Sequence, residues 1–232
     1  MTRAGVAVAV VAVVAIASLG IGGAASALDG NATPTVDAAP ASVAVVAASA
    51  PVNGKVAFVV TNGTERVVRI TRVTALASQT DGGQVLKAST TAVAPAVLAP
   101  GEQAIGQAAF RARSLAADAT FAWKVATKRV ASGTTSSDPS RLTLGNFVLS
   151  PAAVGSVAQT LAFDATNSST KTIAGPLTVN VVCLNEAGKP AVATTTKVDR
   201  AKVRAGATVP ITVKFRELCP NYVVAARGAS ST

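Results

Sequence analysis

Apolar and polar residues alternate with a period of two in several short segments of the chain. The alternation is clearest over residues 56–60, 161–165, 177–183 and 209–215, where apolar side chains occupy every second position. Successive side chains of a β-strand point to opposite faces of a sheet, so this pattern predicts strands with one buried face. Beyond the N-terminal segment no stretch shows the 3.6-residue period of a helix. The chain is therefore predicted to be all-β.

One of these segments recurs later in the chain. Residues 56–62 (VAFVVTN) return as residues 161–167 (LAFDATN), at an offset of 167 − 62 = 105. The same offset, without a gap, pairs further residues: Gly83 with Gly188, Thr90-Thr91 with Thr195-Thr196, Gly101 with Gly206, and Phe110 with Phe215. A register that holds across two loops indicates one supersecondary unit used twice.

Glycine, proline and asparagine mark the turns between the predicted strands. Asp81-Gly82-Gly83 and Glu186-Ala187-Gly188 stand where a hairpin turn is expected, and Pro100-Gly101-Glu102 has Ala205-Gly206 at the equivalent place. Several short strands at regular spacing predict a β-sandwich in each repeat. The predicted division is a signal peptide (1–27), a flexible lead-in (28–41), a first sandwich (42–131), a linker (132–139), a second sandwich (140–229) and a tail (230–232).

The N-terminal segment has the pattern of an export signal. Arg3 precedes an apolar run over residues 4–19, and Ala25-Ser26-Ala27 forms an A-x-A-like cleavage site. We therefore predict a secreted or cell-envelope protein whose mature chain begins at Leu28. The alternative is an uncleaved membrane anchor, because residues 4–28 are long enough to cross a bilayer.

Composition excludes several kinds of catalytic site. The 232 residues include 21 Lys and Arg, 11 Asp and Glu and no histidine, for a net charge of +10. Without histidine there is no Ser-His-Asp or Cys-His catalysis and no His ligand for zinc. The acidic residues are scattered, so we expect no enzyme activity, metal or cofactor. A hydrolase lacking histidine, with a Ser-Lys pair that no spacing singles out, is the remaining catalytic alternative.

The positive charge is spread over both repeats. Residues 42–131 contain ten basic and four acidic residues (10 − 4 = +6), and residues 132–232 contain ten and five (10 − 5 = +5). Basic residues alternate at two places, which supply the candidate anion-contacting residues Arg111, Arg113, Arg200, Lys202 and Arg204. A positive surface attracts anionic polymers. The alternative is a solvated face or a charged edge strand that prevents aggregation.

Cys183 and Cys219 are the only cysteines. In an exported chain an even number of cysteines predicts a disulfide, which here closes a loop of 219 − 183 = 36 residues. At the 105-residue offset the cysteines lie opposite Ser78 and Ser114, which suggests that these positions are neighbours in both repeats. A redox or metal-binding pair is the alternative.

Aromatic residues recur at equivalent inward positions and are therefore predicted to be core. The pairs are Phe58 with Phe163, Phe110 with Phe215, and Phe121 with Tyr222. Few rings remain to stack on sugars or bases, so no nucleic acid partner is expected. The sequence has three N-glycosylation patterns, at Asn31, Asn62 and Asn167. Those at Asn62 and Asn167 fall on the same repeated turn, and turn chemistry explains them better than a glycan.

Turn and core positions of the first repeat resemble those of FxLYD-like domains. The matching residues are Asn62-Gly63-Thr64, Asp81-Gly82-Gly83, and Leu98-Ala99-Pro100-Gly101-Glu102 leading to Phe110. These immunoglobulin-like sandwich domains occur in secreted and cell-envelope bacterial proteins. The resemblance covers most of the first repeat and, more weakly, the second. It implies a binding or structural role and no site residues.

The predicted function is a non-catalytic binding or structural module that acts at the cell envelope. The first alternative is a polyanion-binding protein of the cell wall or membrane surface. The expected partner is an unknown protein or an anionic envelope polymer, and no small-molecule substrate is identified. No residue pattern names the partner.

Overall fold

The structure is a computed structural model of the chain. Its described part comprises residues 42–78, 85–111, 115–116, 118–130, 141–150, 158–216 and 218–229. The predicted signal peptide, lead-in, linker and tail all lie outside these ranges. The described residues belong to one compact unit, Val36–Thr232. Within them, no helix has the length and apolar character needed to cross a membrane.

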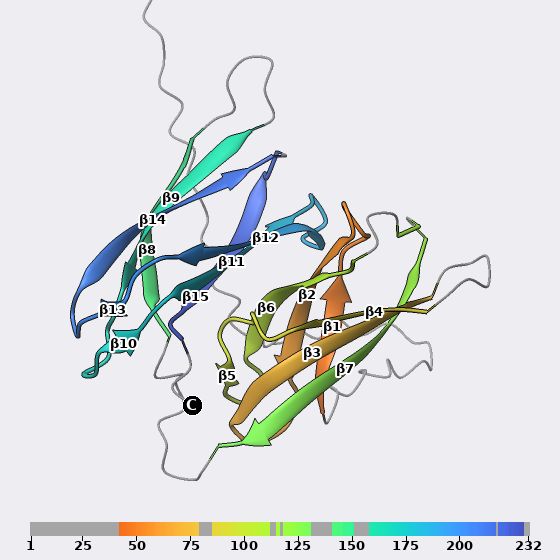
Figure 1. Cartoon of the computed structure of the whole chain (residues 1–232), viewed down its shortest axis with the longest axis horizontal. Helices are drawn as coiled ribbons and strands as arrows, with labels where there is room; N and C mark the ends of the chain where they lie inside the picture. The colour runs from red at the N-terminus through yellow and green to blue at the C-terminus, as the bar shows by residue number, and fades with distance from the viewer. Residues whose placement is uncertain are drawn as a thin grey trace, which may run out of the picture. The chain divides into compact units, whose positions relative to one another are not determined.

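The described residues form strands and no helix, which confirms the all-β prediction (Figure 1). The first repeat contains β1 (Val43–Ala48), β2 (Lys55–Asn62), β3 (Val68–Ser78), β4 (Leu86–Thr90), β5 (Val97–Leu98), β6 (Gln103–Ala109) and β7 (Thr120–Arg129). The second contains β8 (Thr143–Ser150), β9 (Gln159–Thr166), β10 (Ile173–Ala174), β11 (Leu177–Leu184), β12 (Pro190–Val198), β13 (Lys202–Val203), β14 (Thr208–Phe215) and β15 (Asn221–Arg227).

Each repeat encloses its own core between two small sheets, in a sandwich-like arrangement. In the first repeat the sheet β1-β2-β6 faces a sheet in which β3 lies between β4 and β7 (Figure 1). Phe58 and Val73, both 0% exposed, lie between the two sheets. The second repeat has the same order, with β8-β9-β14 facing β12-β11-β15 around Leu161 and Val181. The alternation predicted from the sequence is the burial pattern of these strands.

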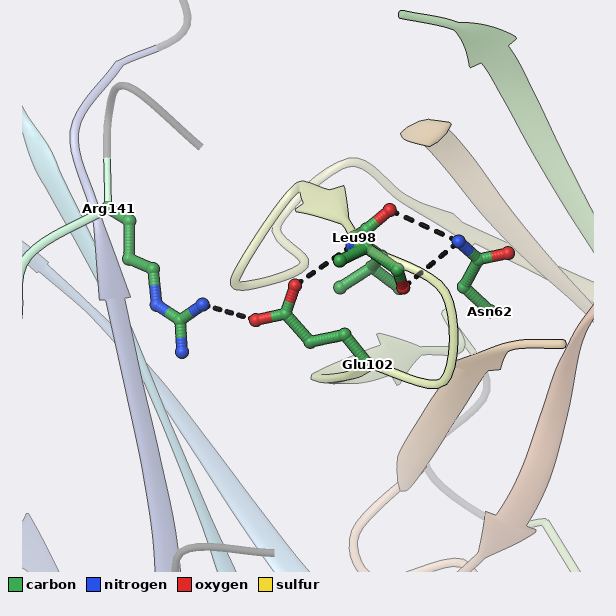
Figure 2. A network of polar contacts seen from close by, with 5 residues as sticks. Asn62, Leu98, Glu102 and Arg141 are labelled. Carbon is green, nitrogen blue, oxygen red and sulfur yellow. Dashed lines mark hydrogen bonds and ion pairs between the residues drawn. The ribbon is translucent and has the colours of Figure 1, made fainter. Parts of the chain in front are cut away.

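A buried asparagine closes the same turn in both repeats. Asn62 is 0% exposed, and its Nδ2 donates to the carbonyl oxygen of Leu98 at 3.1 Å (Figure 2). It also donates to the carbonyl oxygens of Arg66 (2.8 Å) and Ala99 (3.1 Å). Its Oδ1 accepts hydrogen bonds from the backbone N–H and the hydroxyl of Thr64. The side chain thus satisfies backbone groups that would otherwise be buried without partners.

Asn167 repeats this arrangement 105 residues later. Its Nδ2 donates to the carbonyl oxygens of Lys171 (2.8 Å) and Val203 (2.9 Å), and its Oδ1 accepts from Ser169. Asn167 is also 0% exposed. Its Nδ2 is engaged with backbone carbonyls, as is that of Asn62, so neither side chain is accessible to a glycosylating enzyme. The sequence interpretation as turn chemistry is correct for both.

Strand pairing keeps the 105-residue offset at the beginning of β3. Val68 pairs with Leu98 in the first repeat, and Ile173 pairs with Val203 in the second. The differences are 173 − 68 = 105 and 203 − 98 = 105, and all four residues are buried. The gapless offset read from the sequence is therefore correct in this part of the repeat.

The offset becomes 106 in the hairpin that follows, which corrects one prediction. Cys183 pairs with Tyr222 on β15, whereas the residue that pairs with Phe121 on β7 is Ala77, and 183 − 77 = 106. Ala77 is buried like Cys183, but Ser78 is exposed. A shift of one residue moves a side chain to the other face of a strand, so Ser78 does not correspond to Cys183. Ser114 lies outside the described residues.

A small apolar cluster joins the two repeats. Ala57 on β2 and Ile105 on β6 pack with Val182 on β11 and Ala193 on β12, and all four are buried. The outward face of the β12-β11-β15 sheet therefore contacts the outward face of β2 and β6. Small side chains at this contact allow the two sheets to approach closely.

Asn180 fixes the register of this contact. Its Nδ2 donates to the carbonyl oxygens of Ala92 (2.8 Å) and Ile105 (3.2 Å) in the first repeat, and its Oδ1 accepts from Thr195 (2.8 Å). In the period-two alternation of residues 177–183, Asn180 falls on the outward face of its strand. It is on the outward face, but it is 1% exposed because the first repeat covers it.

Candidate anion-binding surface

Five basic side chains lie on the outward face of the sheet formed by β3, β4 and β7. We call this set the cationic face; it consists of Arg69, Arg72, Lys87, Lys124 and Lys128. Arg69 is partly exposed and the other four are exposed. The alternate side chains of these strands, such as Trp123, pack in the core. The second repeat contacts β2 and β6, and leaves this face open.

A β-bulge places Arg69 and Arg72 on the same face. Residues three apart in a regular strand point to opposite sides of the sheet. The pairing of β3 with β7 shifts between Ile70 and Arg72, which leaves Thr71 as the extra residue. The Thr71 hydroxyl donates to the carbonyl oxygen of Ala126 on β7 at 3.0 Å, which stabilises the bulge. Both arginines consequently point away from the core.

The strands of the cationic face carry charge of one sign. Arg69 stands directly opposite Lys128 on the neighbouring strand. Cross-strand pairs change stability by about 0.2–1 kcal/mol, and like charges in this position are destabilising. Strands β3, β4 and β7 contain no acidic residue. Among the described residues none forms an ion pair with any of the five cations.

The equivalent face of the second repeat carries Lys197 and Arg227 at one end, but its middle is uncharged and is covered by the first repeat. In the strand register, Ala193 takes the place of Lys87 and Ala225 takes the place of Lys124. Ala193 belongs to the cluster between the repeats, and Ala225 packs against it. This sheet face of the second repeat thus docks on the first repeat. The equivalent face of the first repeat is basic and open.

The basic residues singled out in the sequence lie elsewhere. Arg200, Lys202 and Arg204 are exposed around the two-residue strand β13, whose Val203 is buried in the core of the second repeat. Arg111 is exposed just after β6. The fifth of the set, Arg113, lies outside the described residues. None of the four described residues belongs to the cationic face.

The structure places a serine and a lysine in one cleft, which bears on the hydrolase alternative. Ser49 and Lys55 both line a cleft beside β6. Ser49 is 5% exposed, and its hydroxyl donates to the carbonyl oxygen of Ala50 (2.7 Å) and accepts from the N–H of Ala57 (3.0 Å). That hydroxyl is engaged with backbone groups, and none of its hydrogen bonds within the described ranges goes to a base. Among the described residues no group of three His, Cys, Asp or Glu could hold a metal ion.

The predicted disulfide is present. Cys183 and Cys219 are bonded, with their Cα atoms 5.3 Å apart, and are 5% and 0% exposed. The bond ties β11 to the segment between β14 and β15 inside the core of the second repeat. A buried disulfide in this place has a structural role.

The aromatic residues are part of the cores, as predicted. Trp123 lies 5.2 Å from Phe58 and 6.0 Å from Phe121, measured between ring centroids. In the second repeat Phe147 lies 5.4 Å from Phe163. These rings pack against one another and present no exposed stacking platform.

Comparison with known proteins adds no assignment. A scan against protein-family models finds no match, and a search of the curated proteins finds none either. The function is therefore argued from the surface itself.

Proposed function

We propose that this protein is an exported, non-catalytic module of two tandem immunoglobulin-like sandwiches whose cationic face binds an anionic polymer of the cell envelope. Export follows from the N-terminal pattern, which predicts cleavage after Ala27. The mature protein should begin at Leu28. Recovery of the full-length chain in washed membranes would instead indicate the uncleaved anchor.

The observation that carries the proposal is the contrast between the two equivalent sheet faces. Where the face docks, it holds Ala193 and Ala225; where it is open, it holds Lys87 and Lys124. Solubility alone is served by charges of both signs, which attract rather than repel one another. A face with five cations and no acid has a cost in folding stability that binding of an anion would offset.

The geometry also favours an extended ligand. Basic residues occupy three neighbouring strands of an open sheet. A repeating anion can lie across such a surface and contact several cations at once. Each basic residue near an anionic surface contributes about 1 kcal/mol, and the total falls with ionic strength.

The test compares two triple variants that remove equal charge. The first is Lys87→Gln/Lys124→Gln/Lys128→Gln on the cationic face, and the second is Arg200→Gln/Lys202→Gln/Arg204→Gln around β13. Binding to fluorescent long-chain polyphosphate is measured by anisotropy over a range of salt concentrations. The first variant should weaken binding about a hundredfold, at roughly 1 kcal/mol per residue, and flatten the salt dependence.

The second triple variant is the matched control. It should bind within about twofold of the wild type, since screened charges more than a Debye length of about 8–10 Å away contribute little. Equal losses in both variants would show that only net charge matters, and would overturn the proposal. A loss confined to the β13 variant would move the site to the residues singled out in the sequence.

A further inference from the structure

A second basic site lies beside β6, apart from the cationic face. It is a cleft of about 510 Å³ between the turn before β2 in the first repeat and strands β12 and β14 in the second. Three cations line it, Lys55, Lys214 and Arg216, and no acidic side chain does so among the described residues. Glu217, which follows Arg216, lies outside those residues. None of the residues of the cationic face contributes to the cleft.

Neutral hydrogen-bonding groups accompany these charges. Asn53, Gln107 and Thr194 line the same cleft. The Nε2 of Gln107 is buried and has no hydrogen-bond partner in the described part of the chain. A buried donor without a partner is unfavourable, and a bound acceptor removes that cost. The terminal amide torsion of glutamine is broad, so a small rotation can direct these N–H groups into the cleft.

A tight turn carries Asn53 at one wall of the cleft. Asn53 and Gly54 both have positive φ, 51° and 72°, and backbone hydrogen bonds between Val52 and Lys55 close the turn on both sides (2.9 and 3.0 Å). Two successive residues with positive φ are typical of a tight hairpin turn. The turn therefore presents Asn53 and Lys55 to the cleft without further ordering on binding.

We propose that this cleft binds a small phosphate-bearing molecule. A phosphate monoester has a charge of about −1.5 to −2 at neutral pH and three strong acceptor oxygens. Three cations and several neutral donors suit that group better than a single carboxylate, and Arg216 can bind it through two parallel hydrogen bonds. The cleft volume falls within the range of small-molecule sites, which is about 300–1,000 Å³.

The test is a titration of the isotope-labelled protein with inorganic phosphate and with glycerol 3-phosphate, followed by amide chemical shifts at constant ionic strength. Glycerol and chloride serve as negative probes. We expect shifts of Asn53, Gln107 and Thr194 that saturate below about 10 mM, an affinity typical of one anion held by a few charge-assisted bonds. Glycerol 3-phosphate should bind at least as tightly as phosphate.

Two variants separate this site from the cationic face. Lys214→Gln/Arg216→Gln should weaken phosphate binding at least about tenfold, the loss expected for two charge-assisted contacts, and should leave polyphosphate binding on the cationic face unchanged. Lys124→Gln/Lys128→Gln should do the reverse. If the first variant does not fold, Lys55→Gln at the exposed first residue of β2 removes one cation without altering a buried side chain. Chemical shifts that keep rising linearly with phosphate concentration, without saturation, would refute the site. An equal loss of phosphate affinity in both double variants would refute it too.

Gln107→Leu gives an independent readout. Loss of the unpartnered amide should raise the melting temperature of the ligand-free protein while it weakens phosphate binding. A purely structural role for Gln107 predicts a lower melting temperature and unchanged binding. That result would remove Gln107 from the proposed site.

Discussion

Lys87 and Ala193 occupy the same place in the strand register of the two repeats, and one is exposed while the other is buried between them. Lys87 pairs with Leu76 on β3, and Ala193 pairs with Val182 on β11. One structural unit has therefore been used for two purposes. At this place in the sheet, the face that docks has an alanine and the face that stays open has a lysine.

Substitutions at these two equivalent positions should have different effects on the free energy of unfolding. Ala193→Lys buries a charge in the contact between the repeats and should lower the free energy of unfolding by about 2–4 kcal/mol. Lys87→Ala on the open face should change it by no more than about 0.5 kcal/mol. Chemical denaturation is followed by the fluorescence of Trp123, the only tryptophan. Equal effects of the two substitutions would mean that the contact does not persist in solution.

Removing the charge repulsion between Arg69 and Lys128 should raise the stability of the protein and weaken its binding to polyphosphate. Lys128→Glu places an opposite charge across from Arg69. The free energy of unfolding should rise by about 0.5–1 kcal/mol, because an attractive cross-strand pair replaces a repulsive one. Polyphosphate binding should fall. Lys197→Glu, at an exposed position of the second repeat, is the control. If Lys128→Glu were more stable than the wild type and bound polyphosphate equally well, the proposed role of the cationic face would be contradicted.

The paired asparagines should be equally important for folding. Asn62→Ala and Asn167→Ala each leave buried backbone carbonyls without a donor, and each should lower the free energy of unfolding by about 2–4 kcal/mol. Asn221→Ala is the matched control, since Asn221 is exposed. Its effect should stay within about 0.5 kcal/mol. Treatment of the folded, purified protein with a glycosylating enzyme should add no glycan at Asn62 or Asn167; modification of either would show that these turns open.

Much of the architecture could be predicted from the sequence, because it follows from local pattern. Period-two alternation identified the strands around Phe58, Phe163 and Ile211, and their buried faces match it. The repeat identified two equivalent units, and an even number of cysteines in one of them indicated the bond between Cys183 and Cys219. These inferences need only neighbours along the chain, or an alignment of the chain with itself.

The cationic face was missed in the sequence because it depends on structural features that a periodic pattern does not show. Arg69 and Arg72 interrupt the alternation of β3, and only the bulge at Thr71 brings them to one face. Lys87 and Lys124 join them through strand pairing across long sequence distances. A one-residue change of offset likewise moved the counterpart of Cys183 from Ser78 to Ala77. One available signal was overlooked, the Asn-Gly dipeptide at Asn53, which is typical of a hairpin turn.

Tyr222 supplies the last prediction, because its hydroxyl is buried and has no hydrogen-bond partner among the described residues. Burial disfavours the charged phenolate and raises the pKa of Tyr222 above its ordinary value. Above a pH of about 10 the unfolded chain therefore releases this proton before the folded protein does. The stability linked to Tyr222 is complete below that pH and is lost as the pH rises through the pKa of the folded state.

Two measurements check the direction of the pKa shift and its effect on stability. Tyr222 is the only tyrosine, so the ultraviolet absorbance of tyrosinate reports on it alone, and its midpoint should lie above 10 in the folded protein and return to about 10 in denaturant. Tyr222→Phe should stabilise the protein or leave it within about 1 kcal/mol at neutral pH, because it removes an unsatisfied hydroxyl. The variant should also lose less stability than the wild type between pH 9 and about pH 11. A folded midpoint at or below 10 would mean that the hydroxyl reaches solvent, and the stability difference at high pH should then vanish.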